Sequence, residues 1–381
     1  MVKFRAKEWL VALTVSLGAA LTFVEVVFRC GLLPMPIVYE SYHFSDEPSH
    51  FRNQYTSFGY TPHSTTREVV LHATLTDVVQ EYDVTFQANN VGLVQRQDIH
   101  KTRGYTVVVG DSFAQGLGAR PWFYDLEAQL PDLALANLGI EGTGVSHWVR
   151  GLEWFARSAA PVKNVVVLFI TDDFLRPYWQ AHLTEDGVSF CDVKSCRLVT
   201  TKYRPVAPQI LFQARHELNA PASWTMRWAK ERLSVTLSQS YVGALTIYLR
   251  RMFLLYLSHD DTLLEQNKSR FVELTKHNDV LFTLHLPQKE EVAAGRWSTE
   301  SLSLRQFVEA TGVRTIDGMA RCGLTIDGFH ARDPHPNESG YAHIEQCLAG
   351  LLREDLTVAA GTALKPQGAV RNVSFRTGPT N

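Results

Sequence analysis

The sequence lacks the features that mark several common functional classes. With 37 Lys and Arg against 39 Asp and Glu, its net charge is −2, which provides no broad attractive field for nucleic-acid phosphates. It has no glycine-rich loop of the kind that cradles nucleotide phosphates, and no internal repeat. We therefore expect no nucleic-acid partner and no cofactor.

Cysteine is also scarce, with five residues in 381. Cys191 and Cys196 lie close together in a polar turn. Cys322 and Cys347 lie near the C-terminal motif described below, and Cys30 lies beside a long apolar run. None has the neighbouring Cys or His ligands that would complete four-coordinate zinc binding, so no metal is expected. Two disulfides are compatible with this distribution, as is a set of free thiols, and the connectivity stays open.

The N-terminus carries a single long apolar run. Three basic residues precede a stretch from Trp9 to Phe28 in which only Glu25 is charged. This length is enough to cross a bilayer, and the positive-inside rule keeps the start cytoplasmic and sends the rest outward, to the periplasm or exterior of a bacterium. We predict a single-pass anchor in the inner membrane over residues 1–35. A cleaved signal peptide is the alternative, because the small residues at 17–20 could admit a signal peptidase.

The pattern after the anchor predicts a lead-in followed by an α/β domain. Residues 36–104 are mixed and polar, with alternating segments at 69–75 and 82–87 that indicate short strands. From 105 to 354, β-branched runs alternate with helical patterns, which indicates a parallel sheet covered by helices on both faces, a three-layer α/β/α fold. The strands are expected at 106–109, 135–138, 165–170, 280–286 and 314–316.

The alternation is interrupted once and ends before the C-terminus. Between about 174 and 257 we predict an insertion that contains a hairpin around 188–200 and then helical segments rich in Trp, Arg and Leu. A last helix is expected from 338 to 353. Residues 355–381 turn to Gly, Thr, Pro and small residues without periodicity, which predicts a flexible tail.

A serine and a histidine occupy the places where such a sheet gathers its chemistry. Gly110-Asp111-Ser112-Phe113 follows a predicted strand and opens a helix, so its glycine permits a tight turn and the helix directs N–H groups toward Ser112. Serine becomes a nucleophile only when a base removes its proton. After the last strands, Asp333-Pro334-His335 supplies a histidine and an aspartate that can orient it. We therefore predict a catalytic triad of Ser112, His335 and Asp333.

These motifs resemble the sequence blocks of the SGNH (GDSL) hydrolase superfamily. Gly110-Asp111-Ser112-Phe113 is similar to the first block, and Asn137-Leu138-Gly139 is similar to the glycine block. Residues 333–341, which read Asp-x-His-Pro-Asn-x-x-Gly-Tyr, resemble the last block. The resemblance extends from about 105 to 351 and implies a flavodoxin-like fold.

The resemblance also implies an oxyanion hole. By the resemblance, Ser112 is the nucleophile, His335 is the general base, and the N–H groups of Ser112 and Gly139 stabilise the oxyanion. The third block departs from the family pattern, because Asp172 stands where the family has an asparagine, and an ionised carboxylate cannot donate a hydrogen bond. Either burial beside Asp173 keeps Asp172 protonated, or its side chain points away, or activity is reduced or lost.

A second pair of residues competes for the role of base. Asp327 and His330 have the Asp-x-x-His spacing that many family members use, whereas Asp333 and His335 have the shorter Asp-x-His spacing. The Pro-Asn and Gly-Tyr pairs that follow His335 tie it to the family block and favour it. Asp327 with His330 is the alternative. Asp111 is expected to support its turn without transferring a proton.

Together these features predict acyl transfer through an acyl-Ser112 intermediate. Water as the acceptor gives an esterase, and a carbohydrate hydroxyl gives an O-acyltransferase. The expected partners are an acylated small-molecule or carbohydrate substrate of the envelope or an exopolysaccharide, and the membrane through the N-terminal helix. The alternative is a non-catalytic carbohydrate-binding or assembly protein on the same fold, which Asp172 keeps open.

Overall fold

Five parallel strands form the centre of the molecule. The computed structural model describes residues 6–30, 40–45, 50–51, 59–73, 78–184, 187–192, five residues between 242 and 249, and 261–362. Within these, the central strands lie in the order β12-β11-β8-β6-β7 and all neighbours are parallel. They are β6 (Tyr105–Val109), β7 (Leu135–Asn137), β8 (Val162–Phe169), β11 (Val280–His285) and β12 (Thr315–Asp317).

This strand order defines where the sheet can hold a site. Counted along the chain, the five strands lie in the order 2-1-3-4-5 of flavodoxin-like folds, so the predicted α/β class with a parallel central sheet is confirmed. The connections reverse direction between β6 and β8, and ligands of open α/β sheets bind beside the carboxyl ends of the strands at that point. Ser112 follows β6 and Asp172 follows β8.

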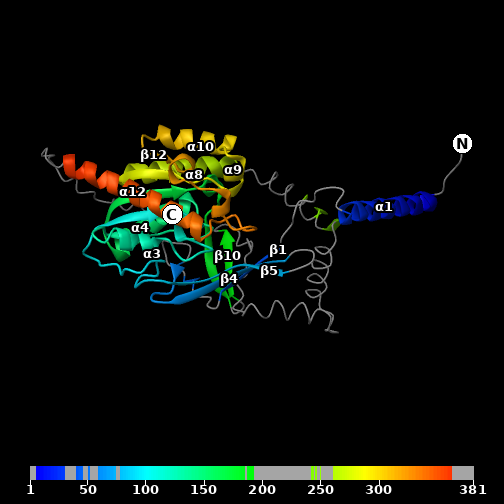
Figure 1. The fold of residues 1–381 in the computed structure, drawn as a ribbon, viewed down its shortest axis with the longest axis horizontal. Helices are drawn as coiled ribbons and strands as arrows, with labels where there is room; N and C mark the ends of the chain where they lie inside the picture. The colour runs from blue at the N-terminus through cyan, green and yellow to red at the C-terminus, as the bar shows by residue number, and fades with distance from the viewer. Residues whose placement is uncertain are drawn as a thin grey trace, which may run out of the picture.

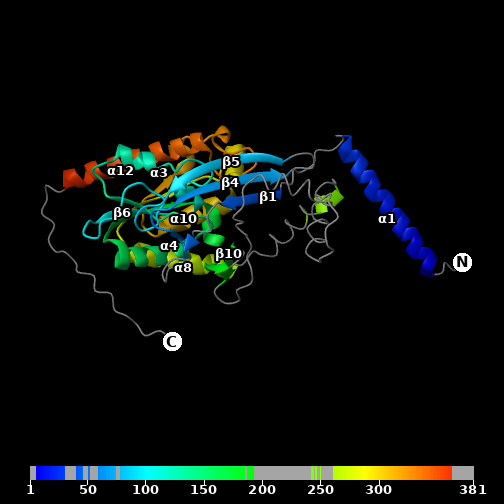
Figure 2. The same ribbon diagram turned by 90° about the horizontal axis from the view of Figure 1, so that it is seen from below.

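Helices cover both faces of the sheet. In β6, Val108 packs into one core while Val107 and Val109 pack into the other, as the two-residue period of a strand requires. Figure 2 shows α3 and α12 on one side of the molecule and α4 and α8 on the opposite side. The first core is closed by α3 (Phe123–Gln129), α11 (Gly318–Cys322) and α12 (Glu338–Thr362), and the second by α4 (Val145–Trp154), α8 (Asp261–His277) and α10 (Thr299–Ala310).

The lead-in contains a second sheet, antiparallel and larger than predicted. β1 (Glu40–Ser45), β4 (Thr65–Ala73) and β5 (Val78–Gln87) pair in the order β1-β4-β5 and lie beside the parallel core (Figure 1). The sequence predicted only short strands at 69–75 and 82–87. Polar side chains on the inward face concealed the start of β4, because Thr66 and Glu68 are as deeply buried as Val70.

Two predicted boundaries are wrong. The hairpin of the insertion is formed by β9 (Trp179–Thr184) and β10 (Gly187–Asp192), earlier than the predicted 188–200. The last helix continues to Thr362, so the predicted tail does not begin at 355. Ion pairs of Glu354 with Arg321 and of Asp355 with Arg314 hold that part of α12 against the domain. Five described residues between 242 and 249 are helical, and the rest of the predicted helical part of the insertion and residues 363–381 lie outside the described residues.

The fold also contains seven shorter elements among the described residues. Most of them are single turns that connect the strands and helices above. They are β2 (His50–Phe51), β3 (Gly59–Tyr60), α2 (Ser112–Gln115), η1 (Phe155–Ala159), η2 (Thr171–Leu175), α9 (Lys289–Ala294) and η3 (Ile326–Gly328). Three of these, α2, η2 and α9, lie directly after the central strands β6, β8 and β11 and therefore at the carboxyl edge of the sheet.

The N-terminal helix α1 (Ala6–Arg29) projects away from the parallel sheet and its helices in both views (Figures 1 and 2), and near its end Glu25 Oε2 accepts the N–H of Val242 at 3.0 Å. Its window Val11–Phe28 has a mean hydropathy of 2.1, and none of it is buried. By length and composition this helix is suited to cross a membrane, and a signal sequence would have the same properties.

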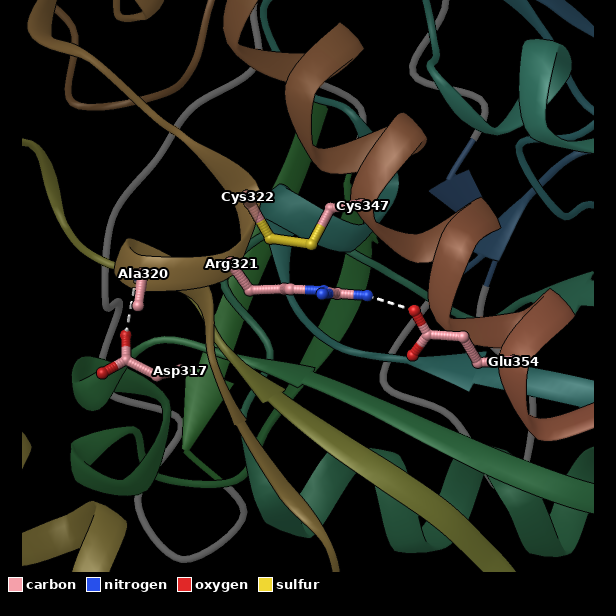
Figure 3. Close-up of a disulfide and its surroundings, with 6 residues drawn as sticks. All are labelled: Asp317, Ala320, Arg321, Cys322, Cys347 and Glu354. Atoms are coloured by element: carbon pink, nitrogen blue, oxygen red, sulfur yellow. Dashed lines mark hydrogen bonds and ion pairs between the residues drawn. A yellow bond between two sulfur atoms is a disulfide. The ribbon is translucent and has the colours of Figure 1, made fainter. Parts of the chain in front are cut away.

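One disulfide joins two elements of the first core. Cys322 in α11 is bonded to Cys347 in α12, with 5.0 Å between their Cα atoms, and the nearby ion pair of Arg321 with Glu354 joins the same two helices (Figure 3). Cys30 is a free, exposed thiol. Cys191 lies in β10, and Cys196 lies outside the described residues.

Candidate active site

Ser112 is the first residue of α2, directly after β6. Asp111 caps this short helix, because its Oδ1 accepts a hydrogen bond from the N–H of Phe113 at 2.8 Å. The N–H of Ser112 belongs to the first turn, where a helix offers no intrahelical acceptor. Gly110 allows the turn to pack tightly, since a Cβ there would lie 2.6 Å from the carbonyl oxygen of Leu168. The turn therefore fixes Ser112 at the carboxyl edge of the sheet.

The structure brings Ser112, His335 and Asp333 together. His335 Nε2 lies 2.8 Å from Ser112 Oγ, and His335 Nδ1 contacts Asp333 Oδ1 on the other side of the ring. Asp333 Oδ1 also accepts the backbone N–H of His335 at 2.9 Å. Nδ1–H then donates to Asp333, which leaves Nε2 free to accept the hydroxyl proton of Ser112.

The imidazole of His335 is held as a stronger base than usual. Burial alone favours the neutral ring, but the carboxylate of Asp333, with a smaller contribution from Asp111, raises the pKa of His335 above its ordinary value. Its side chain remains 16% exposed, so the ring borders solvent where a substrate would enter.

The alternative base pair is not assembled. His330 Nε2 lies 2.8 Å from the carbonyl oxygen of Gly118, and no contact of His330 with Ser112 occurs among the described residues. Burial lowers the pKa of His330, so this ring stays neutral at neutral pH. Asp327 is exposed in η3. The geometry therefore supports the pair Asp333 and His335.

Gly139 lies against α2, but its N–H is already occupied. Asn137 Oδ1 accepts that N–H at 2.9 Å, while Asn137 Nδ2 donates to the carbonyl oxygen of Ala114 at 2.9 Å. A Cβ at Gly139 would lie 2.5 Å from the backbone nitrogen of Gln115, which explains the need for glycine. The N–H that the resemblance assigns to the oxyanion hole is thus directed at Asn137 in this state.

Asp172 does not have the environment expected for it. Asp172 is exposed rather than buried, although desolvation by nearby protein atoms still raises the pKa of its carboxyl. Arg176 and a hydrogen bond to Gln288 oppose this rise, and the charges of Asp111 and Glu290 add to it. Asp111, whose charge contributes to this rise, is the residue before the nucleophile.

A buried ion cluster beneath Ser112 was not predicted. Arg176 Nη1 lies 2.9 Å from Asp111 Oδ2 and 2.8 Å from Asp173 Oδ1, and it donates to the carbonyl oxygen of Thr143 at 2.8 Å. Burial and the charge of Asp111 raise the pKa of Asp173 well above its ordinary value, while Asp173 and Asp111 raise the pKa of Arg176. Asp111 and Asp173 are buried and share one partner, so they require a cation. Arg176 is the next cation after Asp173 in the sequence.

A second polar layer separates the site from the antiparallel sheet. Gln115 Nε2 donates to Tyr60 Oη at 2.7 Å, and Gln115 Oε1 accepts the N–H of Glu141 at 2.7 Å. Burial raises the pKa of Glu141 to about 7, although His335 opposes that rise. Glu68 on β4 is also buried, and burial together with Glu141 raises its pKa. Glu68, on the inward face of β4, therefore lies close to Glu141 in this polar layer.

The described residues contain no group of three or more His, Cys, Asp or Glu side chains arranged to hold a metal ion. The triad itself needs no metal to activate serine, since the base is already in contact with the hydroxyl. The chemistry that the arrangement can perform is nucleophilic attack by Ser112.

Comparisons with known proteins add little to this geometry. No family model matches the sequence, and no curated protein matches it. Among solved structures, the chain is similar to the crystal structure of a member of the lipolytic protein G-D-S-L family from Veillonella parvula DSM 2008. The identity is 12% and the TM-score 0.35, over 66% of this chain and 99% of that chain. This likeness is too distant to bear on function.

Proposed function

We propose that the protein is a serine-dependent acyl-ester hydrolase or O-acyltransferase that works through an acyl-Ser112 intermediate. One observation carries this proposal: the hydroxyl of Ser112 lies 2.8 Å from Nε2 of a histidine whose other nitrogen contacts a buried carboxylate. A serine activated in this way attacks ester carbonyls.

Acylation follows from the direction of the hydrogen bonds. His335 Nε2 takes the proton of Ser112 as Oγ attacks the ester carbonyl, and Asp333 stabilises the imidazolium that forms. The imidazolium then gives this proton to the leaving alcohol, and the acyl group remains on Ser112. In the second half, His335 deprotonates water in a hydrolase, or a carbohydrate hydroxyl in a transferase, and that oxygen takes the acyl group.

The oxyanion would be stabilised mainly from the N-terminus of α2. The N–H of Ser112 has no intrahelical acceptor, whereas the N–H of Gly139 would have to be shared with Asn137. Asp172 cannot donate when it is ionised. Because loss of one donor costs about 10²–10³ in rate, we expect modest turnover by the native chain.

The same donor set supports a second candidate function. A protein that keeps the fold but lacks a complete oxyanion hole could bind carbohydrate or assist assembly without catalysis. Asp172 and the occupied N–H of Gly139 are the observations that favour it.

We further propose that the catalytic domain lies outside the cytoplasm, anchored by α1 in the inner membrane of a bacterium. The apolar window of α1 and the basic residues before it support this orientation. The bond between Cys322 and Cys347 supports it as well, because disulfides persist chiefly in oxidising compartments. On this placement the acylated substrate would belong to the envelope or to an exopolysaccharide.

A fluorophosphonate probe separates the candidate functions. The full-length chain in detergent is treated with the probe beside Ser112→Ala, and labelling is expected in the native chain alone. Labelling that survives the substitution would remove Ser112 from the mechanism. If neither chain is labelled, the binding protein becomes the better hypothesis.

A further inference from the structure

The residues that carry the base form a closed loop, which we call the base loop (residues 330–335). An antiparallel bridge between Phe329 and Pro336 closes it, and the N–H of His330 donates to the carbonyl oxygen of His335 at 3.1 Å. These bonds set the shape of the loop. They do not fix its position relative to Ser112, which lies on a different element 223 residues away in the sequence.

Glu81 on β5 holds one side of the base loop. Its Oε1 accepts the backbone N–H of Arg332 at 2.6 Å and that of Asp333 at 3.4 Å, and its Oε2 lies 3.4 Å from the guanidinium of Arg332. The side chain of Glu81 is only 3% exposed. Hydrogen bonds to an ionised acceptor in so shielded a place are stronger than neutral ones.

An irregularity in β5 directs Glu81 toward the loop. Val70 pairs with Tyr82 and Leu71 pairs with Gln80, so Glu81 is an extra residue between two paired positions. Such a bulge reverses the inward and outward alternation of the strand and can re-aim one side chain. Tyr82 is buried while Gln80 is exposed, as this reversal requires.

Lys289 binds backbone carbonyl groups of the same loop. Its Nζ donates to the carbonyl oxygens of His330 at 2.6 Å and Ala331 at 2.8 Å, and lies 3.4 Å from that of Asp333. Lys289 belongs to α9, which follows the central strand β11. The carboxylate of Glu81, on the antiparallel sheet, therefore accepts N–H groups of the loop. The ammonium of Lys289, on a helix at the edge of the parallel sheet, donates to its carbonyl groups.

We propose that Glu81 and Lys289 are positioning residues that hold the base loop so that His335 faces Ser112. The inference rests on the proposed function, and it gives the antiparallel sheet of the lead-in a part in catalysis. Neither residue touches the reacting atoms in this arrangement. They act through Asp333, whose backbone both of them contact.

Loss of either support should loosen the contact between Asp333 and His335. The carboxylate of Asp333 raises the pKa of His335, so a looser contact lets that pKa fall toward its ordinary value of about 6.5. Asp111, Arg176, Glu141 and His330 also influence His335, and all four are retained in the variants below.

The test follows His335 in the full-length chain in detergent, with isotope-labelled histidine and a pH titration by NMR. The signal of His335 is identified by its absence from His335→Gln. In Glu81→Leu we expect the pKa of His335 to fall and kcat/KM for an activated ester to drop by about 10²-fold, as a misplacement near 1 Å can cause. Glu81→Gln retains one acceptor oxygen and should have a smaller effect in the same direction.

Matched controls separate positioning from a general loss of charge. Asp83→Asn removes a carboxylate from the same strand, one that pairs with Arg67 at the surface, and should change neither quantity. Lys289→Met should lower the pKa of His335, whereas Lys276→Met on the exposed face of α8 should not.

The proposal is overturned if the pKa of His335 and kcat/KM in Glu81→Leu both equal those in Asp83→Asn. Should Glu81→Leu fail to fold by circular dichroism, Glu81→Gln and Lys289→Met are judged by the same comparison. A native chain that takes no fluorophosphonate would instead overturn the proposed function, and the titration would still decide whether Glu81 and Lys289 position His335.

Discussion

The two sides of the candidate site are held in different ways. The nucleophile lies over a buried ion cluster of Asp111, Asp173 and Arg176, all from segments that follow β6 and β8 at the carboxyl edge of the parallel sheet. The base lies on a loop that is held from outside, by Glu81 of the antiparallel sheet and by Lys289 of α9. The position of Ser112 thus depends on the parallel sheet alone, whereas that of His335 depends on both sheets.

The two sides should therefore respond differently to substitution. A substitution within the ion cluster leaves a buried charge without its partner, so it should damage stability first. A substitution around the base loop should damage catalysis first, because it moves a side chain that is already partly open to solvent. The four predictions below test that contrast.

The largest effect is expected on the base side, from Asp333→Asn. The amide favours the wrong imidazole tautomer, and kcat should fall by about 10⁴-fold. His335 acts as a base only when neutral, so activity rises with pH through its pKa, which Asp333 raises. The acid limb of the residual kcat/KM profile should therefore move to lower pH. An unchanged limb would show that Asp333 does not set the pKa of His335.

On the nucleophile side, Arg176→Met should chiefly destabilise the fold. It leaves Asp111 and Asp173 buried without their cation, which should cost about 3–5 kcal/mol in the free energy of unfolding, measured with urea. Arg120→Met is the control, because its pair with Asp125 is exposed and should contribute at most about 1 kcal/mol. Equal losses in the two variants would refute the contrast between the two sides.

Removal of the disulfide tests how the link between α11 and α12 affects stability and turnover. The bond between Cys322 and Cys347 closes a segment of 25 residues, so replacing both by serine should lower the free energy of unfolding by about 3 kcal/mol. Turnover well below the melting temperature should persist, since α11 and the middle of α12 do not touch the triad. Cys30→Ser should alter neither quantity, and a loss of turnover in the folded double variant would contradict the prediction.

The smallest effect, a gain, is expected from Asp172→Asn. The amide removes a negative charge near the oxyanion and offers a donor, which should raise kcat by up to about 10²-fold. KM and the unfolding midpoint should change little, because Asp172 is exposed. An unchanged kcat would mean that Asp172 faces away from the reacting carbonyl.

Much of the central fold could be predicted from the sequence. Of the strands of the parallel sheet, β6, β8 and β11 contain apolar runs that are buried on both faces, so a single sequence marks them well. The start of β4 was missed because Thr66 and Glu68 point inward and break the expected alternation of apolar and polar residues. The course of α12 past 353 was missed because Glu354 and Asp355 form ion pairs with Arg321 and Arg314, which the local sequence does not reveal.

The site was predictable only where its residues lie in local motifs. Ser112 and His335 are each recognisable from the few residues around them, and the structure brings them into contact. The occupation of the Gly139 N–H by Asn137 depends on the exact turn after β7, which spacing does not reveal. Glu81 was missed because its position results from a bulge, and its partner lies 251 residues further along the chain.

That separation of 251 residues has a consequence for how the protein is made. Synthesis proceeds from the N-terminus, so β5 is complete long before the segment it must support exists. Contacts between distant parts of a chain form slowly, because a long loop must close before they can stabilise anything. We therefore expect the nascent chain to carry Glu81 as an unpaired carboxylate until the last stage of folding. Activity should therefore appear late in folding, when the base loop reaches Glu81 on β5.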